Sequence, residues 1–277
     1  MLYETLVTPG HLADHLGDPQ WVVVDCRFTL ADPDAGQAAY LQSHIPGARY
    51  AQIDEVLTKP PYLDRGRHPL PAPDVMMRRF GDLGISNASQ VVAYDDAGGS
   101  VAARLWWMLH YLGHQAAAVL DGGWQAWLQA GLPVSSQPPM PGKANFRGVP
   151  RPGWLVVAGD VPKISLLVDS RAPERYHGEV EDYDPVRGHI PGAVNYHFAR
   201  NLDSEGRFLP PDELRALFAA LHGETPPGEV TYYCGSGVTA CHNLLAQAVA
   251  GLPPGRLYAG SWSDWIRDPA RPVSHDN

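Results

Sequence analysis

The chain repeats itself, and this repeat limits what it can fold into more than any other feature of the sequence. Four short segments recur in the same order at an offset of about 140 residues. Four matches in order are hard to explain by chance, and the period is too long for a solenoid unit. We therefore predict two copies of one domain. The matching pairs are VVVDCR (22–27) with LLVDSR (166–171), SHIPGA (43–48) with GHIPGA (188–193), VVAY (91–94) with VTYY (230–233), and DGGWQAW (121–127) with AGSWSDW (259–265).

A segment rich in proline and glycine separates the two copies. It reads SSQPPMPGKANFRGVPRPG (135–153) and has no apolar period, which is typical of a linker. We predict domains over residues 1–137 and 154–277, joined by a linker over 138–153.

Short apolar runs alternate with helical segments in each copy. Runs such as WVVVD (21–25) and QVVAY (90–94) are continuously apolar, which is typical of strands buried on both faces. PDELRALFAALHG (211–223) and TACHNLLAQAVAG (239–251) have helical character and end in glycine. The alternation predicts an α/β fold of two tandem domains, each a parallel sheet with helices on both faces. In such sheets ligands bind beyond the C-terminal ends of the strands.

The charge and cysteine content narrow the class of partner and compartment. Lys and Arg number 21 against 30 Asp and Glu, a net charge of −9, which argues against nucleic acid as a partner. Three cysteines are too few for a disulfide scaffold, so we expect a reducing, cytoplasmic compartment. The start MLYETLVTPG predicts no signal peptide, and no apolar run is long enough to predict a membrane span.

Cys234 stands where a reactive thiol is expected, directly after the strand VTYY and before a helix, in the loop CGSGVTA. Gly235 and Gly237 allow the backbone to curl, so that several N–H groups converge on the sulfur. The helix N-terminus adds partial positive charge, and both effects favour the thiolate. The alternative interpretation is a buried structural cysteine.

The first copy serves as an internal control for this interpretation. Its loop reads DDAGGSVA, with Asp95 at the position of Cys234. A carboxylate cannot act as a sulfur nucleophile, so we expect the domain over 1–137 to be catalytically silent.

The paired HIPGA segments, the DxR strand ends, the GGW and GSW turns and CGSGVTA together resemble a tandem rhodanese-like sulfurtransferase of the thiosulfate and 3-mercaptopyruvate type. The resemblance implies that Cys234 takes a sulfur atom from a small anionic donor as a persulfide, with ping-pong kinetics. The acceptor is then a thiol such as thioredoxin or glutathione, or cyanide. No cofactor is implied beyond the covalent persulfide.

The sequence CGSGV resembles the 3-mercaptopyruvate type. Thiosulfate-type members carry basic residues just after the cysteine, whereas this chain has Gly235 and Ser236. In the mercaptopyruvate type, a serine two residues after the cysteine works with a histidine and an aspartate. The resemblance carries these roles to Ser236, His68 in GRHPLP and Asp54 in QIDEVL.

The resemblance also implies residues that bind the substrate. Arg175 in ERYHGE matches the arginine that grips the substrate carboxylate. A second arginine is expected nine residues later, but Asp184 stands there, and Arg187, Arg65 or Arg67 could take its place. The other expected substrate contacts come from the cysteine loop, namely Gly235, Gly237, Val238 and Thr239.

Three alternatives compete with this interpretation. A Cys-dependent phosphatase needs the pattern C-x5-R, and Ala240 occupies the arginine position, which excludes it. Two alternatives stay possible: a sulfurtransferase that prefers thiosulfate, and a non-catalytic persulfide carrier or binding module.

No metal site is expected, because Cys241 and His242 lack the spacing of zinc ligands. Residues repeated in both halves are interpreted as structural: the pairs Asp25 with Arg27 and Asp169 with Arg171, and also His44, His189, Trp124 and Trp262.

Overall fold

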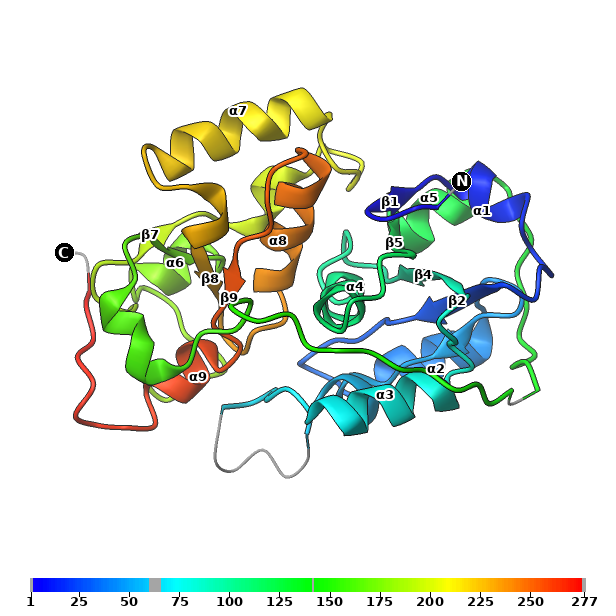
Figure 1. Ribbon diagram of the computed structural model, residues 1–277, viewed down its shortest axis with the longest axis horizontal. Coiled ribbons are helices and arrows are strands. Elements are labelled where there is room, and N and C mark those ends of the chain that lie inside the picture. The colour runs from blue at the N-terminus through cyan, green and yellow to red at the C-terminus, as the bar shows by residue number, and fades with distance from the viewer. Residues whose placement is uncertain (1, 60–65, 141, 276–277) are drawn as a thin grey trace. The chain divides into compact units, whose positions relative to one another are not determined.

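A computed structural model describes residues 2–59, 66–140 and 142–275, and the chain divides into two compact units (Figure 1). The first unit contains Met1–Lys59, Pro71–Arg151 and Leu202–Phe208, and the second contains Pro60–Leu70, Pro152–Asn201 and Leu209–Asn277. This division differs from the predicted one, because each unit takes a segment from the other half of the sequence. The described residues 66–70 thereby become part of the second unit.

The first unit is built on a five-stranded parallel sheet with the order β1-β5-β4-β2-β3. All neighbouring strands of this sheet are parallel. A chain that connects two parallel strands has to cross over one face of the sheet, as in other α/β folds. Its elements are β1 (Leu6–Val7), α1 (Pro9–Ala13), β2 (Trp21–Asp25), α2 (Ala35–Gln42), β3 (Arg49–Tyr50), the π-helical η1 (Ile53–Leu57), α3 (Pro73–Asp82), β4 (Gln90–Tyr94), α4 (Ala102–Tyr111), β5 (Ala117–Leu120) and α5 (Gly123–Gln129).

Both faces of this sheet are buried, as the continuous apolar runs predict. Val23 and Val92 pack on one face with Leu12 of α1 and Trp127 of α5. Side chains alternate along a strand, so Val22, Val24 and Val91 point to the other face, and all are at most 6 % exposed. Helix α4 contacts β4 and β5 without joining the first cluster, so it covers this second face.

The second unit repeats this plan with a four-stranded parallel sheet in the order β7-β6-β8-β9. A parallel bridge from Leu155 to Leu257 takes the place beside β9 that β1 has beside β5. The predicted fold class is thus confirmed. The elements are η2 (Ala158–Lys163), β6 (Leu167–Asp169), α6 (Pro173–Tyr176), β7 (Val194–Asn195), η3 (Phe198–Asn201), α7 (Pro211–His222), η4 (Pro227–Glu229), β8 (Thr231–Tyr233), α8 (Ala240–Val249), β9 (Arg256–Leu257) and α9 (Ser261–Trp265).

A buried ion pair recurs at the end of one strand in each unit, as the repeated DxR segments predict. Arg27 Nη2 lies 2.7 Å from Asp25 Oδ2, and its guanidinium stacks 4.7 Å from the ring of Trp124. Because it joins the turn after β2 to α5, this contact fixes the C-terminal edge of the sheet. The equivalent residues Asp169, Arg171 and Trp262 repeat the arrangement at 2.7 Å and 4.9 Å.

The described residues of the segment predicted as a linker form no helix or strand, yet much of this segment is held against the first unit. The N–H groups of Ala144 and Val149 donate to the carbonyls of Gly81 and Leu112, at 2.8 and 2.9 Å. Phe146 is buried edge-on against Phe80. These contacts explain why the first unit continues to Arg151.

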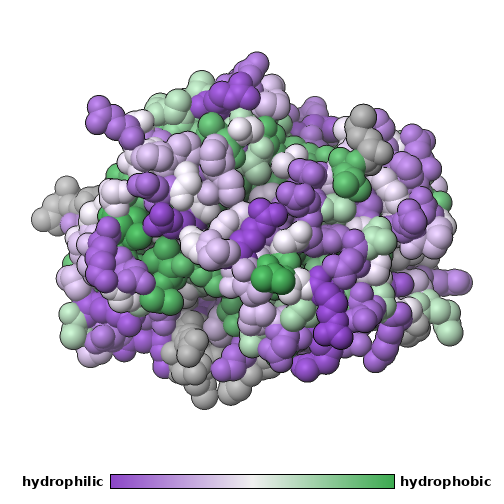
Figure 2. All heavy atoms as spheres, in the orientation of Figure 1, coloured by the Kyte–Doolittle hydropathy of each residue, from purple (hydrophilic) through white to green (hydrophobic). Residues whose placement is uncertain are grey.

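Within the described ranges, no helix is both long and apolar enough to span a membrane. Hydrophilic side chains cover most of the face drawn in Figure 2, and apolar ones stand in small groups between them.

Two buried histidines make the stability of the folded chain decrease as the pH falls. Burial lowers the pKa of His110 in α4 and of His222 in α7 from 6.5 to about 4. His110 Nε2 donates to the carbonyl of Ala117 (3.2 Å), and His222 Nε2 lies 2.8 Å from the hydroxyl of Tyr232. Because the folded-state pKa lies below the unfolded one, the unfolded chain binds more protons between these values. The stabilisation is therefore complete above pH 6.5 and lost as the pH falls toward 4.

We expect His222→Gln and His110→Gln each to make the loss of stability between pH 7 and pH 5 shallower. The measurement is the urea midpoint of tryptophan fluorescence at both pH values. His11→Gln, at an exposed position, is the control and should keep the wild-type slope. Equal slopes for all variants would show that these two histidines do not govern the acid response.

Candidate active site

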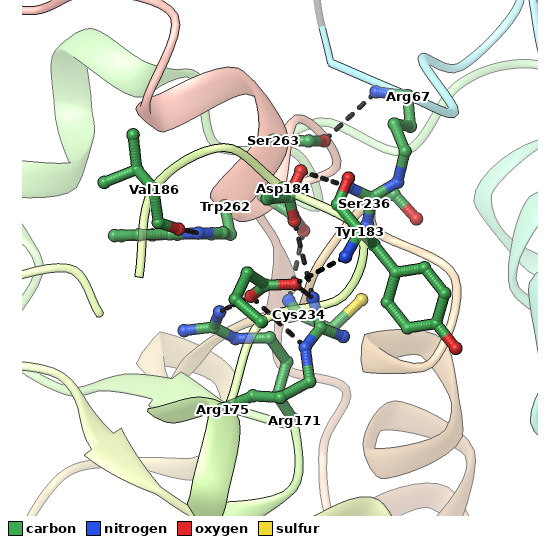
Figure 3. A network of polar contacts seen from close by, with 12 residues as sticks. Arg67, Arg171, Arg175, Tyr183, Asp184, Val186, Cys234, Ser236, Trp262 and Ser263 are labelled. Carbon is green, nitrogen blue, oxygen red and sulfur yellow. Dashed lines mark hydrogen bonds and ion pairs between the residues drawn. The ribbon is translucent and has the colours of Figure 1, made fainter. Parts of the chain in front are cut away.

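Cys234 follows β8 directly and opens the loop that leads into α8 (Figure 3). The residue is only 2 % exposed, and the N–H of Gly237 donates to its sulfur at 3.1 Å. Gly237 has a φ of +78°, and a Cβ there would lie 2.2 Å from the carbonyl oxygen of Ala259. Only glycine fits this turn without displacing backbone, so the turn that points an N–H at the sulfur depends on it.

Ser261 fixes the backbone of Cys234 from the neighbouring turn. The N–H of Cys234 donates to Ser261 Oγ (3.1 Å), and that hydroxyl donates to the carbonyl of Tyr258 (2.9 Å). Ser261 has a φ of +57°, a region that favours glycine. The matching residue of the first copy is Gly123, with a φ of +55°. A strained serine stands where the other copy has glycine, and its hydroxyl supplies an acceptor that glycine lacks.

His68 and Ser236, predicted as partners, lie together in the second unit. His68 Nδ1 is 2.7 Å from Ser236 Oγ, and the two residues are 6 % and 7 % exposed. The segment that carries His68 is held in place because the N–H of Arg67 donates to Ser263 Oγ (3.0 Å). A short, buried hydroxyl–imidazole bond of this kind can relay a proton.

Two guanidinium groups lie over Gly235, the residue after the cysteine. A Cβ on Gly235 would be 2.9 Å from Arg67 Nη2 and 3.4 Å from Arg175 Nη2. Arg67 Nη1 is paired with Asp184 Oδ1, and Arg175 Nη2 lies 2.7 Å from Glu181 Oε1. Figure 3 shows these side chains converging beside Cys234. The arrangement offers N–H donors to an anion that reaches the loop.

The other predicted residues fall in different places. Val238 is buried, and Thr239 is the N-cap residue of α8. Arg187 is exposed, and its role in binding the substrate stays a prediction. The guanidinium group that lies with that of Arg175 over Gly235 is that of Arg67. Asp54 belongs to the first unit, in the first turn of η1, and its partnership with Ser236 stays a prediction. Arg65 lies outside the described residues.

The other two cysteines differ from Cys234 in their surroundings. Burial, with Asp25 and Asp95 nearby, raises the pKa of the Cys26 thiol well above its ordinary value, which keeps it protonated. Cys241 is the second residue of α8, and its thiol donates to the carbonyl of Gly237 (3.5 Å). In the part of the chain that the structure describes, no group of three or more His, Cys, Asp or Glu side chains could hold a metal.

In the first unit, the loop that follows β4 binds a carboxylate of its own chain. The carboxylate of Asp95 accepts four backbone N–H bonds of 2.8–2.9 Å. Oδ1 accepts two of these bonds and Oδ2 accepts the other two, so the Asp95 carboxylate occupies the place in this loop where an anion would bind. The four donors are Ala97, Gly99, Val101 and Ala102.

Sequence reasoning missed Ser261, Ser263 and Glu181. Ser261 had a signal, because the paired turns GGW and GSW differ at this position. Glu181 lies in an irregular segment without a counterpart in the first copy, and no pattern marks it. Its side chain is 1 % exposed and bonds both Arg171 and Arg175.

Comparisons with protein families, with known sequences and with solved structures all indicate the same family. A model of the rhodanese-like domain matches residues 8–130 and 154–268. The chain is 47 % identical to a protein of Pseudomonas aeruginosa named probable 3-mercaptopyruvate sulfurtransferase, over 97 % of each chain. It is 37 % identical to bovine thiosulfate sulfurtransferase, over 96 % of this chain and 93 % of that one. The structure of 3-mercaptopyruvate sulfurtransferase from Leishmania major superimposes with a TM-score of 0.85 at 32 % identity, covering 96 % of this chain and 76 % of that one.

Variants of Ser261 separate backbone strain from hydrogen bonding. Ser261→Ala keeps the positive φ and loses the hydroxyl, so we expect a loss of about 1 kcal/mol or more from the missing bond. Ser261→Gly also loses the hydroxyl but relieves strain worth about 1–2 kcal/mol, so its stability should stay near that of the wild type. Chemical denaturation measures both. If the glycine variant is the less stable of the two, strain at this position is not significant.

Proposed function

This chain belongs to the family of rhodanese-like domain sulfurtransferases, and from that premise we propose that it transfers a sulfane sulfur from 3-mercaptopyruvate to a thiol or cyanide through Cys234. The observation that carries the proposal is the sulfur of Cys234 at the end of β8, with the N–H of Gly237 donating to it. The His68–Ser236 pair in the same unit supports mercaptopyruvate as the donor.

The first half-reaction makes a persulfide. The Cys234 thiolate attacks the sulfur of 3-mercaptopyruvate, the carbon–sulfur bond breaks, and its electron pair leaves with pyruvate as the enolate. The enolate takes up a proton to become pyruvate, and Cys234 holds the additional sulfur. Ser236, bonded to His68, is the hydroxyl that we assign to this proton transfer.

The second half-reaction returns the enzyme to its starting state. The acceptor, a thiolate or cyanide, attacks the outer sulfur, the sulfur–sulfur bond breaks, and the electron pair returns to Cys234 as thiolate. Glutathione and the thiol of thioredoxin are acceptors of the required chemistry.

Backbone donors in the loop support the binding of the persulfide anion. In the first unit, the N–H groups of Ala97, Gly99 and Val101 bond the carboxylate of Asp95. Their counterparts are Ser236, Val238 and Ala240, whose N–H groups have no acceptor among the described residues. We assign them to the negative charge on the outer sulfur, which lies further from the backbone than Cys234 Sγ. The same comparison supports a silent first domain, because Asp95 already fills the corresponding loop.

Arg175 and Arg67 are the residues that we assign to the donor's carboxylate. Each presents N–H groups over Gly235, and both side chains are partly exposed, at 19 % for Arg175 and 23 % for Arg67. Thiosulfate, the donor in the name of the bovine relative, is the alternative. The residues after the cysteine, Gly235 and Ser236, are uncharged, and the two arginines over Gly235 are each paired with an acid, which leaves departing sulfite no unpaired cation from these residues and favours mercaptopyruvate.

Replacing the nucleophile tests the covalent step. We expect wild-type protein incubated with 3-mercaptopyruvate alone to gain the mass of one sulfur atom, and cyanide to remove it as thiocyanate. Cys234→Ser should show neither mass gain nor turnover. Cys26→Ser is the matched control, since the second copy carries Ser170 at that position, and it should behave as the wild type. A persulfide that forms once but never turns over would indicate a carrier rather than an enzyme.

Removing the proposed proton donor tests the choice of sulfur donor. We expect Ser236→Ala to lower kcat for 3-mercaptopyruvate by about a hundredfold, the size of general acid–base assistance. Turnover of thiosulfate should fall much less, because sulfite leaves without needing a proton. Steady-state kinetics with both donors and cyanide measure the two effects. Equal losses would argue against a proton-transfer role for Ser236, and faster wild-type turnover of thiosulfate would overturn the donor assignment.

A further inference from the structure

The charged side chains beside the cysteine loop form a cluster with no net charge. Three guanidinium groups and three carboxylates are joined by ion pairs within the second unit. An anionic donor that reaches the loop therefore meets two arginines whose charge is already balanced by acids. The members are Arg67, Arg171, Arg175, Asp169, Glu181 and Asp184.

Asp184 is the carboxylate that connects the two arginines over the loop. Its Oδ1 is paired with Arg67 Nη1, and its Oδ2 lies 3.4 Å from Arg175 Nη2. The carboxylate is 4 % exposed, whereas the two arginine side chains are 23 % and 19 % exposed. Asp184 is thus more deeply buried than the two arginines that it joins, and both of these arginines approach Gly235.

The position of Asp184 has two opposite electrostatic effects on a bound anion. It holds the two guanidinium groups side by side, so that both can donate to one ligand. It also repels that ligand, and Coulomb repulsion grows in proportion to the ligand's charge. A dianion such as thiosulfate is therefore penalised twice as strongly as a monoanion such as 3-mercaptopyruvate.

We infer that Asp184 is a specificity-determining residue, which sets the preference of this site for singly charged over doubly charged sulfur donors. The inference rests on the proposed function and adds to it a physical reason for the choice of donor. It predicts that the preference follows the charge at position 184 rather than the net charge of the protein.

The test compares two substitutions that remove the same charge. Asp184→Asn should raise kcat/KM for thiosulfate about tenfold more than kcat/KM for 3-mercaptopyruvate, as one unit charge at short range predicts. Asp182→Asn removes a charge from an exposed position two residues away and should leave the ratio unchanged. Asp184→Glu keeps the charge and should retain the wild-type ratio. The shift should shrink as ionic strength is raised.

A binding measurement separates this inference from the sulfurtransferase proposal. In a Cys234→Ser background neither donor can transfer sulfur, so calorimetry reads the affinities for thiosulfate and 3-mercaptopyruvate directly. Adding Asp184→Asn should tighten thiosulfate about tenfold more than mercaptopyruvate. Equal shifts for the two donors, weaker binding of both, or the same result from Asp182→Asn would overturn the inference. If wild-type protein forms no persulfide while the binding ratio still shifts, the proposed function fails and the charge selectivity stands.

Discussion

The turn from a buried strand into a helix leaves several backbone N–H groups without partners, and this constraint shapes both halves of the molecule. Peptide N–H groups inside a fold need acceptors, since an unpaired buried donor is costly. In the first unit Asp95 supplies a carboxylate that accepts four of them. In the second unit Cys234 supplies a sulfur that accepts the N–H of Gly237, while the N–H groups of Ser236, Val238 and Ala240 find no acceptor in the described part of the chain. One backbone shape thus serves as a closed structural turn in one copy and as an anion site in the other.

The same constraint explains why the supporting shell differs between the copies. Asp95 bonds the loop with its own side chain, so the neighbouring turn needs only Gly123, which takes the positive φ without strain. In the second unit the sulfur of Cys234 accepts one N–H of the loop, and Ser261 Oγ accepts the N–H of Cys234 at the cost of a strained φ. Placing a small nucleophile in this loop therefore needs a second residue to hold the backbone.

The ion-paired arginines beside Cys234 show how positive charge near the cysteine loop is balanced by acids. Unpaired arginines packed over a sulfur would bind any anion, including inhibitory sulfate or phosphate. Glu181 and Asp184 reduce this attraction while they orient the guanidinium groups through their ion pairs. Their burial, at 1 % and 4 % exposed, keeps water from screening the pairs, so their influence on a ligand extends over the loop.

The parts of this fold that sequence predicts are those with a repeated or strongly periodic signal. The long helix α7 begins at Pro211 and ends before Gly223, as its pattern predicts. The short elements α6, α9 and β7 span two to five residues and are too short to show a period. Helix α2 is built from small residues and has no apolar face that marks it. Long-range packing determines these elements, and a single sequence does not record it.

The site divides in the same way between what local sequence specifies and what the fold brings together. Cys234 and its glycines are predictable because loop geometry is local. The approach of His68 to Ser236 across 168 positions was carried only by resemblance to a family, since no periodicity links them. Arg67 is one of several candidates for the second arginine. The bond from its own N–H to Ser263 Oγ holds it where its guanidinium lies over Gly235, whereas Arg187 lies at the surface.

The position of Asp184 illustrates why departures from a family pattern carry information that the pattern does not. A family likeness predicts an arginine there, and the aspartate first reads as a lost ligand. In the folded chain the aspartate recruits Arg67 from a different segment, so the number of guanidinium groups over Gly235 is kept while one charge is cancelled. A substitution that changes net charge without changing the number of donors leaves recognition of an anion possible and alters which anion is preferred. Selectivity between donors can therefore evolve in this fold without any change to the cysteine loop.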